Sequence, residues 1–354
     1  MGFIEVLSDN GLAVENWEKE IFSTYIGKLI WKPFMGTGSG SMIQVKQDLT
    51  KKKGDAITIG IRGRIQGGQV TGNAKAKDNE GTLVFYNQRF VVDNVRRAVK
   101  IEDIPMTEQR TMFGVLKQAR EALEEEFAVD LDEAITQGMM GDLSTGKVQG
   151  RYLYGILNSN YDATHATALA TIDNTADKLS TKMISVAKRK ATLPRNAVNK
   201  IRPIRVKNGK NFEEWFTMFA HDYCIRDLVE LDSAWLNAQL NIPPRTGSSN
   251  PIFTGSHFKG AWDGVLIYQH SDLDLSTNSN SIQVAHNLLM GAQSGAVVWA
   301  QKSKFAEEGS DFGHDVAYEL HEIRNIGKLV FNSTDGGSQE DNGIINVFAA
   351  AVAD

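Results

Sequence analysis

Apolar and polar residues alternate along residues 54–68, and this period of two predicts a β-strand. The alternating apolar positions are Ile57, Ile59, Ile61 and Ile65. A polar stretch follows at 69–81, and residues 82–92 then have the composition of a second strand. We therefore expect a long two-stranded hairpin over about 54–100 with a solvated tip. Because an isolated hairpin is only marginally stable in water, this hairpin needs support from elsewhere.

The apolar period lengthens to three or four residues over 107–138, which predicts one long α-helix. Its apolar stripe consists of Met112, Leu116, Ala119, Leu123, Phe127, Leu131 and Ile135. Thr107 stands at the N-cap position of this helix and Gly138 at the C-cap position. At ~1.5 Å per residue the helix is about 45 Å long. A long helix beside a long hairpin indicates a protein whose elements extend toward neighbouring molecules.

Shorter patterns predict the remaining elements. An N-terminal helix is predicted over 17–29, because its apolar residues recur every three or four positions and Pro33 follows. Further helices are predicted at 182–194, 223–232, 232–240 and 284–293. Strands are predicted at 201–206, 213–221, 252–255, 264–270, 295–301, 318–333 and 343–353. Helices and strands alternate irregularly rather than in βαβ repeats, so the fold class is α+β.

Composition narrows the class of protein. Hydrophobic residues make up 42% of the 354 residues and charged residues 23%, which is ordinary for a folded protein. The single cysteine, Cys224, excludes an internal disulfide framework. No apolar run approaches the ~18 residues of a membrane span, and no signal peptide opens the sequence. We expect a folded protein with no membrane partner.

Motifs for catalysis are weak. Residues 141–148 have the spacing of a phosphate-binding loop, but Val148 stands where the motif needs a hydroxyl, so a surface loop is the better interpretation. His221 and Cys224 are interpreted as residues at the start of a helix. His314 and His321 lie among acidic residues and are the best candidates for an enzyme or metal site, yet their spacing matches no ligand motif. We expect no catalytic residue, cofactor or metal.

Basic residues are concentrated in one segment. Ten basic residues and no acidic residue lie from Lys182 to Lys210, in a chain whose net charge is −5. The candidates for contact with DNA or with another subunit are Lys188, Arg189, Lys190, Arg195 and Lys200. Three interpretations stay open: nonspecific contact with a nucleic-acid backbone, contact with an acidic face of a neighbouring copy, or a solvated face. That acidic face is centred on Glu307, Glu308 and Asp311.

Several long stretches resemble one family. They are WEKEIFSTYI (17–26), FMG (34–36), IQVKQDLTKKKGDAITIGIRG (43–63), DNVRRAVKIEDIPMTEQR (93–110), NPIFTGSHFKGAWDGVLIYQ (250–269) and LLMGAQSGAVVWAQK (288–302). In these stretches and in the order of its elements, the chain resembles tailed-bacteriophage major capsid proteins of the Hong Kong 97-type fold. More specifically, it is similar to the phage N-four-type family. The resemblance is poorest at 139–180 and after Asn332.

The resemblance implies a division of the chain. It implies an N-terminal arm (1–53), an extended hairpin loop (54–100), a peripheral domain (101–180) with a spine helix (107–138), an axial domain (181–285) and a return to the peripheral domain (286–354). It further implies hexamers and pentamers of the chain in an icosahedral virion capsid around double-stranded DNA, assembled in the host bacterial cytoplasm. A separate scaffolding protein and a portal are the implied partners, with a decoration protein as a further candidate.

The resemblance also assigns roles to residues. The expected inter-subunit contacts are Arg62, Arg64, Arg96, Arg97, Trp17 and Tyr25. The expected hinges are Gly36, Gly38, Gly40, Gly67 and Gly68. A covalent link between subunits through Lys75 or Lys77, as in some capsids of this fold, is not expected, because no catalytic glutamate is evident beside them. The alternatives are a soluble α+β enzyme with a site near His314 and His321, or a nonspecific DNA-binding protein acting through 182–210.

Overall fold

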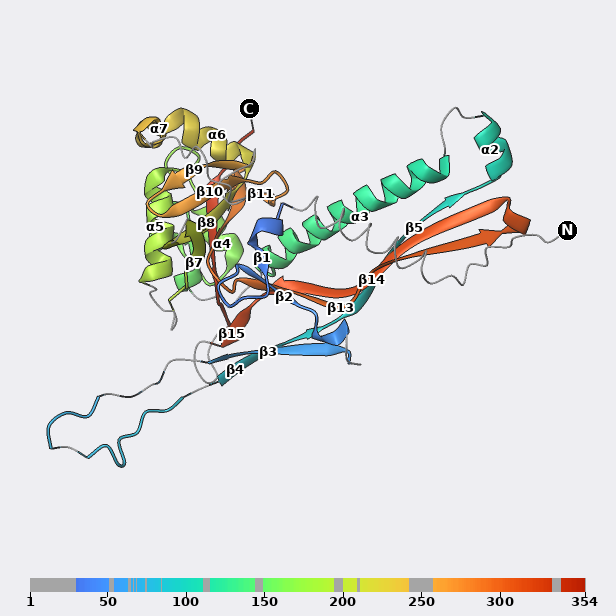
Figure 1. The fold of residues 1–354 in the computed structure, drawn as a ribbon. Helices are drawn as coiled ribbons and strands as arrows, with labels where there is room; N and C mark the ends of the chain where they lie inside the picture. The colour runs from blue at the N-terminus through green and yellow to red at the C-terminus, as the bar shows by residue number, and fades with distance from the viewer. Residues whose placement is uncertain are drawn as a thin grey trace.

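The computed structural model describes residues 30–50, 54–62, 65, 67, 69–73, 75–83, 85–110, 115–143, 149–193, 200–208, 211–241, 257–332 and 339–353. The helix predicted over 17–29 and the strand predicted over 252–255 lie outside these residues. So do the candidate residues Trp17, Tyr25, Arg64, Gly68 and Arg195. Figure 1 shows a body of sheet and helices from which a long helix, a long pair of strands and a separate hairpin extend.

The body is built on an eight-stranded mixed sheet. Its main path runs through β6 (Tyr152–Tyr154), β17 (Ile344–Ala350), β12 (Gln283–Met290), β8 (Asn211–Ala220), β10 (Val265–Gln269) and β9 (Phe258–Trp262). Two short strands complete it: β11 (Leu275–Thr277) pairs with β12, and β7 (Ile204–Asn208) pairs with β8. The central strands β12 and β17 are buried along almost their whole length because both faces of the sheet are covered.

Helices cover the two faces of this sheet. The helices of the body are α4 (His165–Ala170), α5 (Thr181–Thr192), α6 (Asp222–Leu231) and α7 (Ser233–Asn241). Helices α5 and α6 pack on one face, and Trp31, Phe34 and the long helix α3 (Val115–Met140) pack on the other. Short 3-10 turns lie at η1 (Lys32–Phe34), η2 (Asp48–Thr50), η3 (Gln149–Arg151), η4 (Asn158–Asn160) and η6 (Asp311–Gly313).

The helix predicted over 284–293 is wrong, because this segment forms strand β12. A segment that is buried on both faces has no exposed polar face, so its period does not separate a buried strand from a buried helix. The two polar residues in the run are hydrogen bonded inside the sheet. His286 Nε2 lies 2.9 Å from Asn346 Oδ1, and Asn287 Oδ1 accepts a hydrogen bond from the His221 backbone N–H at 2.9 Å.

The second sheet has five strands and carries the long elements. Its order is β1 (Met35–Gly36), β2 (Ile43–Lys46), β13 (Gly295–Ser310), β14 (Asp315–Lys328) and β5 (Asp93–Ile101). Strands β13 and β14 form a long antiparallel hairpin that reaches far from the body (Figure 1). Buried and half-buried side chains alternate along β14, because one face of the sheet lies against α3.

The predicted spine helix is confirmed in its centre and wrong at both ends. The structure describes α2 (Ile104–Arg110) and α3, and α3 buries Leu123, Phe127, Leu131 and Ile135 as the stripe predicted. Thr107 lies inside α2 rather than at an N-cap, and its hydroxyl donates to the Glu102 carbonyl.

At the other end, Gly138 lies inside α3 rather than at a C-cap, where a Cβ would come within 3.1 Å of Ile326 on β14. The glycine needed at the helix end is Gly141, which has a φ of +62°.

The predicted hairpin is confirmed at its base and wrong over 93–100, because those residues form β5 of the five-stranded sheet and pair with β14. Strand β3 (Ala56–Arg62) pairs with β4 (Phe85–Val91), and Ile57, Ile59 and Ile61 face inward against Phe90, Leu329 and Phe331. The amide of Gln88 donates to the Lys328 carbonyl and accepts from the Val330 N–H. Val330 begins β15 (Val330–Asn332), which pairs with β16 (Gln339–Asp341). The base of the hairpin is therefore supported by its own chain.

The sheets do not follow the division expected at 285/286. Strand β12 crosses that boundary, and β17 lies between β6 and β12 in the centre of the body. Long-range pairing of this kind leaves no signal in the local pattern, so a boundary drawn along the sequence misses it. None of the described helices is both long and apolar enough to span a membrane.

Substitution of Gly141 tests the end of α3. A Cβ there would lie 2.5 Å from Lys328 Cε, whereas at Gly72, with a similar φ of +67°, nothing lies within 4 Å. We expect Gly72→Ala to cost about 1–2 kcal/mol from backbone strain alone. Gly141→Ala should cost at least about 1 kcal/mol more, because of crowding. Denaturant unfolding of the free subunit measures both, and equal losses would contradict this packing.

Candidate assembly surfaces

The outer face of the hairpin carries exposed apolar side chains. Phe85 is 69% exposed and Val91 48% exposed on β4, and Ile65 is exposed beyond β3. Arg62 is also exposed at the end of β3. Arg89 forms an ion pair with Asp55 at 3.4 Å, and both side chains remain largely exposed. This face has the mixture of apolar and cationic groups that a protein contact uses.

Arg96 and Arg97 have different surroundings on β5. The Arg97 guanidinium lies 2.6 Å from Asp130 and 3.1 Å from Glu126, both on α3. Hydrogen bonding to Asp130 raises the pKa of Arg97, so its charge already serves a contact within the subunit. Arg96 is exposed on the same strand. Of this predicted pair, Arg96 is the better placed to reach another molecule.

The tip of the β13–β14 hairpin is apolar and acidic. Phe312 is fully exposed, and both it and Asp311 have left-handed backbone conformations, with φ of 53° and 47°. Glu308 is exposed nearby, whereas Glu307 forms an ion pair with Arg120 of α3 at 3.1 Å. The acidic face considered as a partner for the basic segment therefore lies at this tip.

The two histidines of the enzyme alternative do not form one site. His314 precedes β14 and His321 lies within it, so seven strand residues put them roughly 20 Å apart. His314 lies 3.8 Å from Asp103, and His321 lies 3.5 Å from Glu319. Each histidine therefore has its own acidic neighbour, and a single metal ion cannot bind both.

The basic segment separates into buried and exposed cations. Lys188 forms an ion pair with Asp263 at 2.7 Å. Lys190 Nζ donates to the carbonyls of Gln149 and Tyr152, and burial lowers its pKa to about 8. Arg189 and Lys200 are exposed. Among the described candidates, these two are the cations placed to meet DNA or another subunit.

The predicted hinge glycines differ in backbone conformation. Gly67 has a φ of +133°, which favours glycine, whereas Gly36, Gly38 and Gly40 have no such φ. Gly36 pairs in β1, and Gly38 accepts a hydrogen bond from the Ser41 N–H at 3.1 Å. The backbone conformation therefore does not by itself require glycine at these three arm positions, and their role as hinges stays a prediction.

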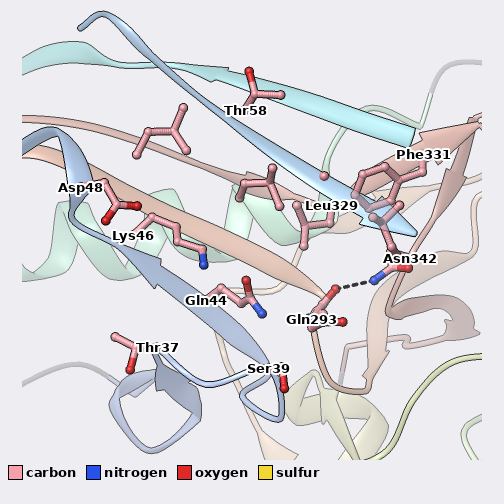
Figure 2. Close-up of a pocket in the computed structure, with 14 residues that line it drawn as sticks. Thr37, Ser39, Gln44, Lys46, Asp48, Thr58, Gln293, Leu329, Phe331 and Asn342 are labelled. Atoms are coloured by element: carbon pink, nitrogen blue, oxygen red, sulfur yellow. Dashed lines mark hydrogen bonds between the residues drawn. The ribbon is translucent and has the colours of Figure 1, made fainter. Parts of the chain in front are cut away.

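A groove of about 410 Å³ separates the arm from β3. Figure 2 shows Gln44 and Lys46 of β2 on one side and Thr58 of β3 on the other. Leu329 and Phe331 line its apolar end, and Asn342 closes it by donating to the Gln293 carbonyl at 2.9 Å.

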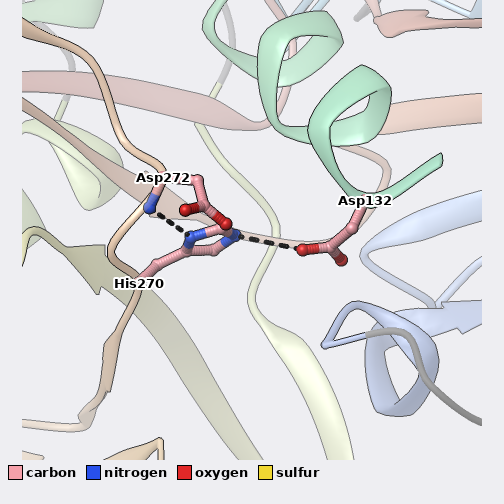
Figure 3. Close-up of side chains that lie close together, drawn as sticks. All are labelled: Asp132, His270 and Asp272. Atoms are coloured by element: carbon pink, nitrogen blue, oxygen red, sulfur yellow. Dashed lines mark hydrogen bonds and ion pairs between the residues drawn. The ribbon is translucent and has the colours of Figure 1, made fainter. Parts of the chain in front are cut away.

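A buried contact joins the arm, α3 and the body, and the sequence pattern did not reveal it. Trp31 Nε1 donates to Thr136 Oγ1 at 3.2 Å, and His270 Nε2 lies 3.2 Å from the same oxygen. Asp132 faces the same histidine (Figure 3), and its Oδ2 lies 3.9 Å from His270 Nε2. The Asp272 backbone N–H donates to the other ring nitrogen of His270, Nδ1. Burial raises the pKa of Asp132 to about 6 and lowers that of His270.

A second buried cluster lies where the sheets meet, and the sequence pattern did not reveal it either. Arg151 pairs with Glu340, and Lys328 pairs with Asp341 at 3.0 Å. The Asn346 side-chain amide donates to Asp341 at 2.9 Å. These residues come from four elements far apart in the sequence, so no local spacing signals them. The cluster holds buried ions and amides together, and Lys328 also lines a cavity of about 800 Å³ beside β4.

The supported hairpin, the long helix packed along a long strand pair and the mixed α+β body define the Hong Kong 97-type capsid fold. A family model described as phage capsid protein matches residues 5–353. The chain therefore belongs to the phage capsid protein family, and it is a structural protein of the phage head.

Solved structures agree with this assignment. The chain is 25% identical to the capsid protein of cyanophage Pam1, with 92% of each chain covered and a TM-score of 0.77. It is 23% identical to that of Ralstonia phage GP4, with 92% of each chain covered and a TM-score of 0.76. The head protein of Helicobacter pylori bacteriophage KHP40 has the same fold at 14% identity, with 92% and 91% coverage and a TM-score of 0.68. A comparison with curated proteins finds no match.

The pKa of Asp132 predicts a pH-dependent stability. In the folded chain the pKa of the Asp132 carboxyl lies near 6, above the ordinary 3.8. The protonated carboxyl therefore stabilises the folded state relative to the ionised carboxyl. This contribution is fully present below about pH 3.8 and is lost as pH rises through 6, which amounts to at most about 3 kcal/mol. The free energy of unfolding of Asp132→Asn, relative to that of the natural chain, should therefore be higher at pH 7.5 than at pH 4.5.

Denaturant unfolding of free subunits at the two pH values measures this difference. Asp130→Asn serves as the control, because Asp130 lies on the same helix but is partly exposed beside Arg97. A difference between Asp132→Asn and the natural chain that stays constant with pH would contradict the assignment.

Proposed function

We propose that many copies of this chain assemble, as hexamers and pentamers, into an icosahedral shell that encloses double-stranded DNA. The observation that carries the proposal is the capsid family match over residues 5–353. The long elements agree with it, because the hairpin and the β13–β14 pair expose apolar groups far from the body. A subunit whose surfaces are completed by its neighbours needs such elements.

The outer face of the β3–β4 hairpin is our candidate for the contact with an adjacent subunit. Its base is held by Leu329 and Phe331 of the same chain, so the hairpin presents a fixed face rather than a loose loop. Phe85, Val91 and Arg62 are exposed on it. Each contact can be weak, because a closed shell repeats it many times.

The sheet arrangement refines the proposed domains. We assign the peripheral domain to the five-stranded sheet with α2 and α3. We assign the axial domain to the eight-stranded sheet with α5, α6 and α7, which brings β12 and β17 into it. The connecting segments expected from the sequence, an arm over 1–53 and a hairpin loop over 54–100, each lend strands to the peripheral domain: the arm supplies β1 and β2, and residues 93–100 form most of β5.

DNA contact in this proposal is nonspecific and electrostatic. Arg189 and Lys200 are the exposed candidates for it, whereas Lys188 and Lys190 are engaged within the subunit. An acidic neighbouring tip around Asp311 remains the other candidate partner for the same cations. A separate scaffolding protein, a portal and a decoration protein are further proposed partners, and assembly is proposed to take place in the host cytoplasm.

Removal of the hairpin tip tests the role of the hairpin. We expect a chain that lacks residues 66–81 to fold but to form no closed shells, because the tip no longer reaches the adjacent subunit. Electron microscopy and sedimentation velocity of the chain, co-expressed with its scaffold, measure this. The control is Lys75→Ala with Lys77→Ala, which should assemble normally because no covalent link is expected there. Normal shells from the deletion would refute this role.

Two phenylalanines of β4 separate assembly from folding. Phe85 is exposed and Phe90 is 4% exposed, so they differ in burial on the same strand. We expect Phe85→Ser to change unfolding free energy by less than about 0.5 kcal/mol and to reduce shell yield strongly. Phe90→Ser should cost about 3–5 kcal/mol of stability. Denaturant unfolding curves and counts of closed particles are measured for both variants and for the natural chain. Full assembly of Phe85→Ser would argue against this face as the contact between subunits.

A further inference from the structure

The groove between the arm and β3 holds two polar side chains that the subunit itself does not use. Gln44 is 5% exposed, yet no described residue forms a hydrogen bond with its side-chain amide. Lys46 follows on the same strand, and in the part of the chain that the structure describes it has no acidic partner. Both side chains point into the groove (Figure 2). Because a buried amide without a hydrogen-bond partner is unfavourable, these groups indicate that another molecule completes the groove.

The two walls of the groove define the chemistry of that molecule. The wall formed by β3 is apolar, because the half-buried side chains of Ile57, Ile59 and Ile61 line it. The wall formed by β2 carries the unpaired ammonium of Lys46. Asp48 also lines the groove, but it is exposed, so water weakens its repulsion of an anion. The occupant therefore needs an apolar side chain beside a negatively charged one.

The tip of the β13–β14 hairpin offers this combination. Phe312 is fully exposed, and it directly follows the exposed Asp311. The φ angles of Asp311, Phe312 and Gly313 are 47°, 53° and 90°, so the whole tip has positive φ. Glycine, asparagine and aspartate form such turns most easily, so a phenylalanine there is unfavourable for the backbone and for its solvation. Strained residues of this kind cluster at functional sites, which indicates a binding role for Phe312.

The tip cannot reach the groove of its own chain. Lys46 pairs with Val298 in the five-stranded sheet, and β13 continues for twelve positions (298 to 310) before the tip begins. At ~3.3 Å per strand residue, the tip lies roughly 40 Å from Lys46. In Figure 1 the hairpin extends away from β2. The tip and the groove can meet only between two copies, and such a head-to-tail contact closes into rings when the rotation between copies allows it.

We propose that the hairpin tip of one copy docks in the groove of a second copy. Phe312 packs on the isoleucines of β3, and the Asp311 carboxylate pairs with the Lys46 ammonium. The Gln44 amide forms a hydrogen bond with the backbone of the tip. The inference rests on the proposed function, because it needs a second copy of the chain. It is separate from the contact proposed for the outer face of the hairpin, since these isoleucines lie on the inner face.

Exchange of the two charges tests the docking. Lys46→Glu and Asp311→Lys each bring like charges together, so we expect each to lower the yield of closed particles at least about tenfold. The double variant restores opposite charges and should recover most of the yield. Because the two residues are roughly 40 Å apart within one chain, this recovery can come only from contact between copies. Electron microscopy and sedimentation velocity measure the particles formed by each chain, co-expressed with its scaffold.

The natural chain, measured alongside, separates this inference from the proposed function. Closed particles at full yield from the natural chain and from both single variants would overturn the docking and leave the proposed function standing. Loss of particles in the single variants without recovery in the double variant would also overturn the pairing of Asp311 with Lys46. If the natural chain formed no particles, the proposed function would be refuted and the docking with it.

Two further variants test the groove and the tip separately. Gln44→Leu removes an unpaired buried amide, so the free subunit should become more stable in denaturant while the yield of particles falls. Phe312→Ser should not lower the free energy of unfolding, and it should lower the yield at least about tenfold. Leu157→Ser, at a residue of the body that is 56% exposed, is the matched control and should assemble fully. A less stable Gln44→Leu subunit, or full assembly of Phe312→Ser, would contradict the inference.

Discussion

The buried ions at the junction of the sheets are the constraint on which the other elements depend. Lys328 and Asp341 join the end of β14 to β16, while Arg151 and Glu340 join the same region to the edge of the body. Buried charges are expensive to desolvate, so such pairs add little net stability. Removing one partner is costly, however, by about 3–5 kcal/mol, because the other charge stays buried and unpaired. The cluster therefore selects one arrangement of the sheets, although it adds little to the free energy of unfolding.

From this junction the long elements extend with only one face supported. Helix α3 lies along β14, and the hairpin base lies on Leu329 and Phe331. The opposite faces carry exposed groups such as Phe85 and Phe312. A compact enzyme would bury these groups in its own core, whereas a shell subunit leaves them for its neighbours. The rigid junction allows such distant surfaces to keep a defined geometry.

Local periodicity predicted the hairpin and the centre of the long helix, because each has one buried face that repeats in the sequence. The same reasoning failed for β12, where both faces are buried and the period is lost. It also misplaced the end of α3, since the close approach of Gly138 to Ile326 depends on a distant strand. The candidate contacts on the hairpin followed from the pattern, but the Asp132 and Lys328 clusters could not. Their members come from segments far apart in the sequence that only the folded sheets bring together.

Hydrogen exchange of the β3–β4 hairpin, compared between free subunits and assembled particles, tests the central claim most directly. The claim is that a neighbour completes the support of this hairpin, so its amides should exchange much more slowly after assembly. Amides of β17, buried in the body, should exchange equally slowly in both forms and serve as the internal reference. Unchanged exchange of the hairpin in closed particles would show that no neighbour covers it and would contradict the account.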